Sequence, residues 1–144
     1  MPDARVDTIV RGGQVVTSSQ VYDAAIAISG EKIVALGPES LLPPADRYID
    51  AEGKLVLPGL IDCHVHLDRI DDYALGSRAA AYAGLTTLIP FGNYDVEADE
   101  SLPAAIHRTR EEVNASALVD FGFHIILQNR PSVLNGLRQA MELG

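Results

Sequence analysis

The sequence predicts an α/β fold in two parts: a β-rich segment over residues 1–57, and alternating strands and helices over residues 58–144. In the first part, short apolar runs are separated by turn residues and show no helical period. In the second part, three nearly continuous apolar runs alternate with three segments of helical period. Such alternation is typical of parallel β-α-β units, whose strands are covered on both faces.

The β-rich part is expected to begin with a hairpin. Residues 7–11 and 14–17 are apolar runs on either side of Gly12 and Gly13, and a two-glycine loop between strands is a hairpin signal. Further strands are expected between glycine, proline and acidic turns, at residues 21–29, 32–36, 48–50 and 54–57.

The second part is expected to hold three strand–helix units, with strands at residues 60–67, 85–91 and 117–127. Asp71 and Asp72 can cap the first helix, and Gly84 can end it. Ser101 can cap the second helix, and Ser132 can start the third. Apolar side chains at helical spacing should face the sheet, in turn Leu75, Ala79, Tyr82 and Ala83, then Leu102, Ile106, Thr109 and Val113, then Leu134, Leu137 and Met141.

Composition and charge disfavour several classes of partner and location. The chain carries 11 basic and 20 acidic side chains, a formal net charge of −9, so we expect no nucleic-acid partner. No apolar run approaches the roughly 18 residues of a membrane helix, and the first residues show no signal-peptide pattern. The single cysteine, Cys63, cannot form an internal disulfide, which favours a reducing, cytoplasmic location.

Ionisable side chains gather on one face of the strand expected at residues 60–67. Because side chains alternate along a strand, Asp62, His64, His66 and Asp68 should share a face. Two imidazoles two residues apart can direct ring nitrogens at one ion about 2.0–2.1 Å away, with carboxylates supporting the rings. The residues alone favour metal ligation and a structural role about equally, because four ionisable groups on one face of a sheet rarely stay unpaired. Two ligands do not by themselves complete a zinc site.

The remaining histidines and the cysteine are expected to play structural roles. His107 falls on the polar side of a helix and should be solvated. His124 falls in a strand and should find a hydrogen-bond partner without a metal. Cys63 alternates away from the histidine face and should pack rather than react.

The stretch Pro58-Gly-Leu-Ile-Asp-Cys-His-Val-His-Leu-Asp68 resembles the first-strand motif of the amidohydrolase superfamily. More narrowly, the chain is similar to the cyclic-amide hydrolases of that superfamily, namely hydantoinase, dihydropyrimidinase, allantoinase and dihydroorotase. Gly76-Ser-Arg-Ala-Ala-Ala and Gly84-Leu-Thr-Thr follow in the usual order. Asp120-Phe-Gly-Phe-His124 resembles the third strand of hydantoinases and dihydropyrimidinases, so the likeness covers nearly the whole chain.

This resemblance implies an incomplete (β/α)₈ TIM barrel, with its first three units at residues 58–144, preceded by strands of a small β-sandwich at residues 1–57. It implies one or two Zn²⁺ ions in the complete enzyme, with His64 and His66 as ligands of the more buried ion. Asn93 lies just past the second strand, where dihydroorotase uses an asparagine to hold substrate. No catalytic residue is expected in this chain, because the family's bridging lysine, two further histidines and catalytic aspartate come later.

The implied function is metal-dependent hydrolysis of a C–N bond in a small-molecule cyclic amide. The resemblance further implies a homo-oligomer, dimer or tetramer, in which this chain is an N-terminal portion that is inactive alone. Asp68 stands where dihydroorotase has a substrate-binding arginine, which disfavours that activity, although Arg69 is adjacent. Allantoinase, a deaminase of the superfamily and a non-catalytic dihydropyrimidinase-like scaffold are compatible with the same motifs. The pair His64 and His66 argues against the scaffold.

Overall fold

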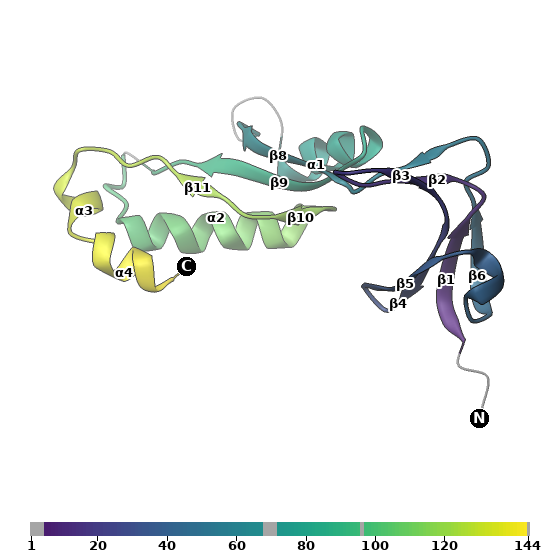
Figure 1. Ribbon diagram of the computed structural model, residues 1–144. Helices are drawn as coiled ribbons and strands as arrows, with labels where there is room; N and C mark the ends of the chain where they lie inside the picture. The colour runs from purple at the N-terminus through teal and green to yellow at the C-terminus, as the bar shows by residue number, and fades with distance from the viewer. Residues whose placement is uncertain (1–4, 68–71, 96, 144) are drawn as a thin grey trace. The chain divides into compact units, whose positions relative to one another are not determined.

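The computed structural model describes residues 5–67, 72–95 and 97–143 (Figure 1). The chain divides into two compact units, Met1–Pro58 and Gly59–Gly144. The first unit consists mainly of strands and the second combines strands with helices, as the sequence predicts.

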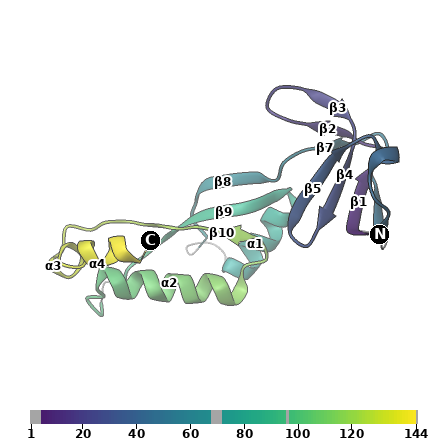
Figure 2. The same ribbon diagram turned by 60° about the horizontal axis from the view of Figure 1, so that its bottom comes forward.

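Within its described residues, the first unit holds a four-stranded and a three-stranded sheet (Figure 2). The four-stranded sheet has the order β5-β4-β1-β6 and comprises β1 (Val6–Arg11), β4 (Ala25–Ser29), β5 (Lys32–Gly37) and β6 (Ala45–Asp50). The three-stranded sheet has the order β3-β2-β7 and comprises β2 (Gln14–Val16), β3 (Val21–Asp23) and β7 (Leu55–Val56). A short 3₁₀ helix, η1 (Glu39–Leu41), follows β5.

The hairpin predicted around Gly12 and Gly13 is wrong, because β1 and β2 lie in different sheets. Gly12 adopts a φ of +76°, and the chain turns a corner there instead of reversing. A Cβ on Gly13 would lie 2.9 Å from the side chains of both Ala51 and Val56. The corner therefore depends on close approach by the neighbouring strand, which the local sequence does not reveal.

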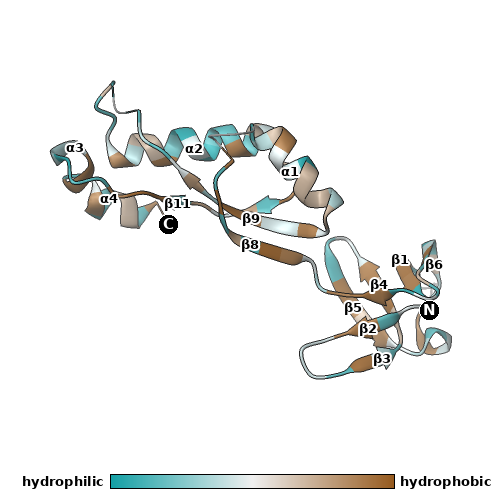
Figure 3. Ribbon diagram, turned by 90° about the horizontal axis from the view of Figure 1, so that it is seen from above, coloured by the Kyte–Doolittle hydropathy of each residue, from teal (hydrophilic) through white to brown (hydrophobic). Residues whose placement is uncertain are grey.

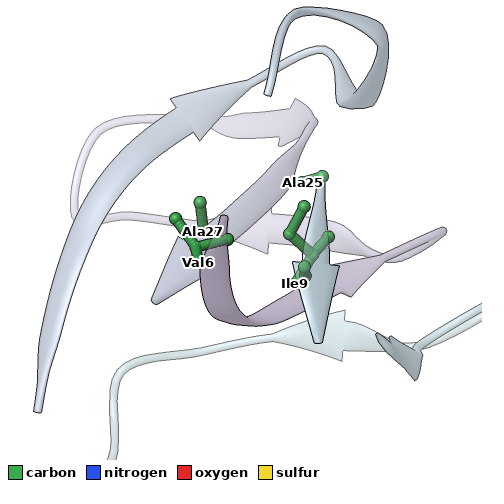
Figure 4. Packing of buried hydrophobic residues seen from close by; sticks show 5 residues of the cluster. Val6, Ile9, Ala25 and Ala27 are labelled. Carbon is green, nitrogen blue, oxygen red and sulfur yellow. The ribbon is translucent and has the colours of Figure 1, made fainter. Parts of the chain in front are cut away.

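The strand predicted at residues 21–29 is likewise divided, into β3 of one sheet and β4 of the other. The β4–β5 hairpin is present: Ser29 pairs with Lys32 across Gly30, whose φ is +59°. The core of this unit is a cluster of small and branched side chains (Figure 4), namely Val6, Ile9, Ala25, Ala27 and Ala45.

The second unit is built on parallel strands, as the β-α-β pattern predicts. Both β8 (Leu60–Val65) and the third-strand pieces pair in parallel with the central β9 (Leu85–Gly92). The third strand, expected at residues 117–127, forms only two short pieces, β10 (Asp120–Phe121) and β11 (His124–Ile125). The helices are α1 (Tyr73–Tyr82), α2 (Leu102–Ser116), α3 (Pro131–Leu134) and α4 (Leu137–Glu142).

Two of these helices begin where the sequence predicts. The Asp72 carboxylate accepts from the backbone N–H of Leu75 at 2.6 Å and caps α1. The Ser101 hydroxyl accepts from Ala104 N at 3.4 Å and caps α2. Figure 3 shows α1 and α2 beside one another on one side of the β8–β9 pair. The predicted buried face of α2 is confirmed at all four positions, Leu102, Ile106, Thr109 and Val113.

The predicted buried face of α1 is wrong. Leu75 and Tyr82 are 52% and 91% exposed, and Ala79 and Ala83 are exposed as well. The buried positions are instead Tyr73, Gly76 and Ser77. A Cβ on Gly76 would lie 2.6 Å from the Leu67 side chain, so close packing against Leu67 selects the face on which Gly76 lies.

The third helix is also interrupted. The structure has α3 and α4 in place of one helix starting at Ser132, and the predicted apolar face at Leu134, Leu137 and Met141 is exposed. Val133 is the buried position of α3. Gly136 separates the helices and approaches Pro103 of α2 so closely that a Cβ would lie 2.7 Å from its ring. Among the described residues, no helix has the length and apolarity needed to cross a membrane.

Candidate functional site

His64 and His66, the two predicted metal ligands, both direct their rings at one neighbour on β9. Their ring centroids lie 4.7 Å and 4.8 Å from the centroid of Phe91. The two imidazole centroids are 5.5 Å apart. Both histidines are exposed, and neither ring is hydrogen-bonded to any residue that the structure describes. Their ring nitrogens are therefore available to a ligand.

This arrangement is compatible with a shared metal ion. A nitrogen–zinc distance of about 2.0–2.1 Å places each ring centroid roughly 3 Å from the ion, so two rings can share an ion when their centroids lie within roughly 6 Å. His64 and His66 meet that condition at 5.5 Å. Over residues 5–67, 72–95 and 97–143, no group of three or more His, Cys, Asp or Glu side chains is placed to hold a metal. The pair thus supplies two ligands of the three or more that a zinc site needs.

The strand that carries the pair is irregular. The β8–β9 register shifts between Asp62 and Val65, so the strict alternation assumed from the sequence does not hold there. Asp62 is in register with Leu88 of β9. Leu88 lies three residues before Phe91, so the side chains of Leu88 and Phe91 point to opposite faces of the sheet, and Asp62 lies on the face of Leu88. The expectation that Asp62 shares the histidine face is therefore wrong.

The Asp62 carboxylate bonds to the main chain rather than to an imidazole. Its Oδ1 accepts from the backbone N–H of His64 at 3.0 Å. This bond satisfies an amide at the irregular point of the strand. The other carboxylate proposed to support the rings, that of Asp68, lies outside the described residues.

His124 of β11 completes a group of three imidazoles around Phe91. His124 is the register partner of Phe91, and their ring centroids are 4.9 Å apart. His124 Nε2 lies 3.3 Å from the carbonyl oxygen of Cys63, on the far side of β9. Since a carbonyl only accepts, Nε2 carries the proton. The hydrogen-bond partner that the sequence leads us to expect for His124 is thus the Cys63 main chain.

Cys63 differs from its predicted environment. It is a free and exposed cysteine, whereas alternation along the strand predicts a packed one. Ile61, which the same alternation predicts to be packed, is 64% exposed as well, so the face expected to be covered is open along this part of β8. His107, by contrast, is exposed on α2, as predicted.

Asn93, the predicted substrate-binding residue, directly follows β9 and is half-buried. Its main-chain oxygen accepts from Arg108 Nη2 of α2 at 2.5 Å. Arg108 also donates to Glu100 from Nε and Nη2, both at 3.0 Å. Glu100 in turn accepts from the backbone N–H of Asp95 at 2.7 Å. The structure therefore fixes the backbone at Asn93.

The electrostatics of this loop follow from the same contacts. Hydrogen bonding to Arg108 lowers the pKa of Glu100, and the Glu100 side chain is only 10% exposed. The same bond raises the pKa of Arg108. Burial, with a contribution from the charge of Glu100, raises the pKa of Tyr94. The Tyr94 hydroxyl is buried with no hydrogen-bond partner among the described residues.

The sequence pattern does not indicate that Phe91 or Arg108 contributes to this region. Phe91 lies at the end of a predicted strand, but its contact with both histidines depends on the shifted register. The spacing of Arg108 and Glu112 predicts their ion pair on α2. No comparable spacing predicts the bond from Arg108 to Glu100, which lies in the preceding loop.

Comparisons with known proteins identify relatives along nearly the whole chain. No family model matches it. It is 33% identical over 147 residues to D-hydantoinase from Ralstonia pickettii, covering 96% of this chain and 31% of that protein. It is 30% identical over 129 residues to dihydropyrimidinase-related protein 5 from Mus musculus, covering 85% of this chain and 22% of that protein.

The fold has a close structural counterpart. A solved structure of D-hydantoinase matches with a TM-score of 0.85 and 32% identity, over 96% of this chain and 31% of the other. The chain therefore spans less than a third of the length of these relatives.

Proposed function

We propose that the whole protein is a hydantoinase-like or dihydropyrimidinase-like hydrolase. The premise is that this chain is related to the N-terminal part of the cyclic-amide hydrolases of the amidohydrolase superfamily. Its reaction is hydrolysis of a C–N bond in a small cyclic amide, dependent on a metal. The observation that carries the proposal is the convergence of His64 and His66 on Phe91, with both rings free of bonds to described residues.

In this proposal, His64 and His66 hold the metal, for which we propose Zn²⁺, with one or two ions in the complete enzyme. When bound, such an ion supplies Lewis acidity, which polarises a carbonyl and favours ionisation of water near neutral pH. Phe91 gives the pair an apolar wall on the β9 side. Asn93 is proposed to bind substrate from the end of β9, where Arg108 fixes its backbone.

We further propose that residues 58–144 are the first three units of a (β/α)₈ barrel and residues 1–57 part of a β-sandwich domain. The parallel order of β8, β9 and the two pieces of the third strand supports this architecture. Successive parallel neighbours with helices along one side are how such a barrel begins. The remaining ligands and the catalytic groups would then come from later strands, so this chain alone is proposed to be inactive.

We also propose a cellular location and an oligomeric state for the complete protein, on the basis of the same relatives. Cyclic-amide hydrolysis in the cytoplasm fits the free thiol of Cys63. A dimer or tetramer is proposed for the complete protein. Cell fractionation and sedimentation of the complete gene product would test these two points.

The experiment that tests the function is an assay of the complete gene product, loaded with Zn²⁺, on hydantoin, dihydrouracil, allantoin and dihydroorotate. We expect ring opening of hydantoin or dihydrouracil. His64→Ala and His66→Ala should each reduce kcat/KM by at least about a hundredfold, because each removes a metal ligand. His107→Ala, at an exposed histidine of α2, is the matched control and should retain wild-type activity.

Absence of turnover of all four substrates by the metal-loaded protein would contradict the proposal. It would favour a non-catalytic scaffold, which the hydantoinase matches do not favour at present.

A further inference from the structure

His124 bonds across the sheet to the strand that carries the histidine pair. It lies on β11, directly beside Phe91 of β9. Its Nε2 lies 3.3 Å from the carbonyl oxygen of Cys63 on β8, so the contact spans β9. The hydrogen bond therefore connects the first and third strands of the sheet without involving the ladder of the second.

The carbonyl that His124 reaches lies at an irregular point of β8. The β8–β9 register shifts between Asp62 and Val65, so the regular ladder does not define the backbone at Cys63. The ring of His124 supplies a side-chain donor for this carbonyl. The Cys63 carbonyl leads directly into the peptide bond of His64, so its direction helps to set the direction of the first imidazole.

The other side of the same short segment is held by Asp62. Its carboxylate accepts from the backbone N–H of His64 at 3.0 Å. The peptide unit between Cys63 and His64 thus has both polar groups bonded to side chains: its N–H to Asp62 and its C=O to His124. Two bonds on one peptide plane restrict its rotation.

We propose that His124 is a positioning residue for the His64–His66 pair. By donating Nε2–H to the Cys63 carbonyl, it fixes the peptide plane that precedes His64, and with it the start of the segment from which both imidazoles approach Phe91. This inference rests on the proposed function, because it takes the two imidazoles as ligands of one metal ion. His124 contributes its Nε2 to the main chain and is not counted among the two ligands.

The first test reads the geometry without any metal. In the ¹⁵N-histidine-labelled chain at pH 7.5, the side-chain nitrogen spectrum should show His124 as the Nε2–H tautomer. His124→Leu should shift the ring signals of His64 and His66, whereas His107→Leu, the same change at an exposed histidine, should leave them in place. His124→Gln should preserve them, because its side-chain amide can donate to the same carbonyl.

The second test measures Zn²⁺ affinity of the same variants by titration. His124→Leu should weaken binding about tenfold, the lower end of the usual cost of losing a group that orients a ligand. His124→Gln should stay within about threefold of the wild type. Amide spectra of each variant verify that the unit is folded.

The outcomes separate this inference from the proposed function. Wild-type ring signals and wild-type Zn²⁺ affinity in His124→Leu would overturn the positioning role while leaving metal binding intact. Equal Zn²⁺ affinity in the wild type and His64→Ala would overturn the metal pair. In that event the ring signals of His124→Leu still decide the positioning role, because they are read without metal.

Discussion

At the residue scale, Glu100 connects the loop after β9 to helix α2. Its carboxylate accepts from both Arg108 and the Asp95 amide, and it is mostly shielded from water. Arg108 in turn binds the main chain of Asn93. The ionised form of Glu100 therefore stabilises the loop on which the proposed substrate-binding residue lies.

We predict that Glu100→Gln destabilises the second unit by about 1–2 kcal/mol at pH 7, because it weakens a charge-assisted bond whose arginine is partly exposed. The pKa of Glu100 is lowered from an ordinary value of 4.5 in the folded chain. Its stabilisation is therefore complete above about pH 4.5 and is lost as pH falls through the folded pKa. The difference in unfolding free energy between wild type and variant should shrink accordingly below pH 4.5.

Urea unfolding followed by the amide signals of α2, at pH 7 and pH 3, measures this difference. Glu112→Gln is the matched control, since Glu112 pairs with the same arginine through an exposed contact and should cost no more than about 0.5 kcal/mol. A Glu100→Gln penalty that is equal at both pH values would contradict the ionic explanation.

The histidine pair shows what single residues reveal in advance. Its spacing of two residues predicts a common direction, and the structure shows both rings at Phe91. Asp62 obeys the same spacing but lies on the other face, because the register shift intervenes. A strand irregularity depends on the neighbouring strand, and the sequence of β8 alone carries no signal for it.

At the scale of elements, the chain passes from one sheet to the other at the corner formed by Gly12 and Gly13. The neighbouring segment, which runs from β6 to β7, changes sheet at the same place. β1 pairs in parallel with β6 before the corner, and β2 pairs in parallel with β7 after it. The backbone N–H of Ala51 donates to the backbone carbonyl oxygen of Arg11 at 2.8 Å, which keeps the two segments together through the turn. The side chain of Ala51 packs against Gly13 so closely that no room remains for a Cβ.

We predict that Gly13→Ala destabilises the first unit by about 1–3 kcal/mol, the usual cost of forcing an extra methyl group into a packed site. Gly37→Ala is the matched control, because a Cβ at Gly37 meets nothing within 4 Å. Thermal unfolding followed by the signals of β1 and β4 measures both variants. Equal stability of the two would contradict the packed corner.

The start of a helix is predictable from local sequence, whereas its buried face depends on tertiary contacts. Asp72 and Ser101 cap their helices because a cap involves only the residues of the first turn. The buried face of α1 depends on Leu67 packing over Gly76, so the apolar period of that helix indicates the wrong side. The hairpin prediction fails for the same reason, since two glycines permit either a reversal or a corner.

At the scale of the whole molecule, the order of elements was predictable, and so was the end of α1 before Gly84, whereas the extent of the third strand was not. Alternating apolar runs and helical segments predict the parallel pairing of β8, β9 and the third strand. The third strand is reduced to two short pieces, although residues 117–127 are largely apolar. Gly122 lies between the two pieces, whereas the end of β11 before the apolar residues Ile126 and Leu127 has no comparable local signal.

The central claim is that His64 and His66 act as one metal-binding pair, and a Zn²⁺ titration of the ¹⁵N-histidine-labelled chain at pH 7.5 tests it most directly. We predict that the ring nitrogen signals of both residues move together, with a common affinity, and that neither moves when the other is replaced by alanine. His107, exposed on α2, serves as the internal reference and should not respond. Independent responses of His64 and His66, or a response of His107 at the same Zn²⁺ concentration, would contradict the account.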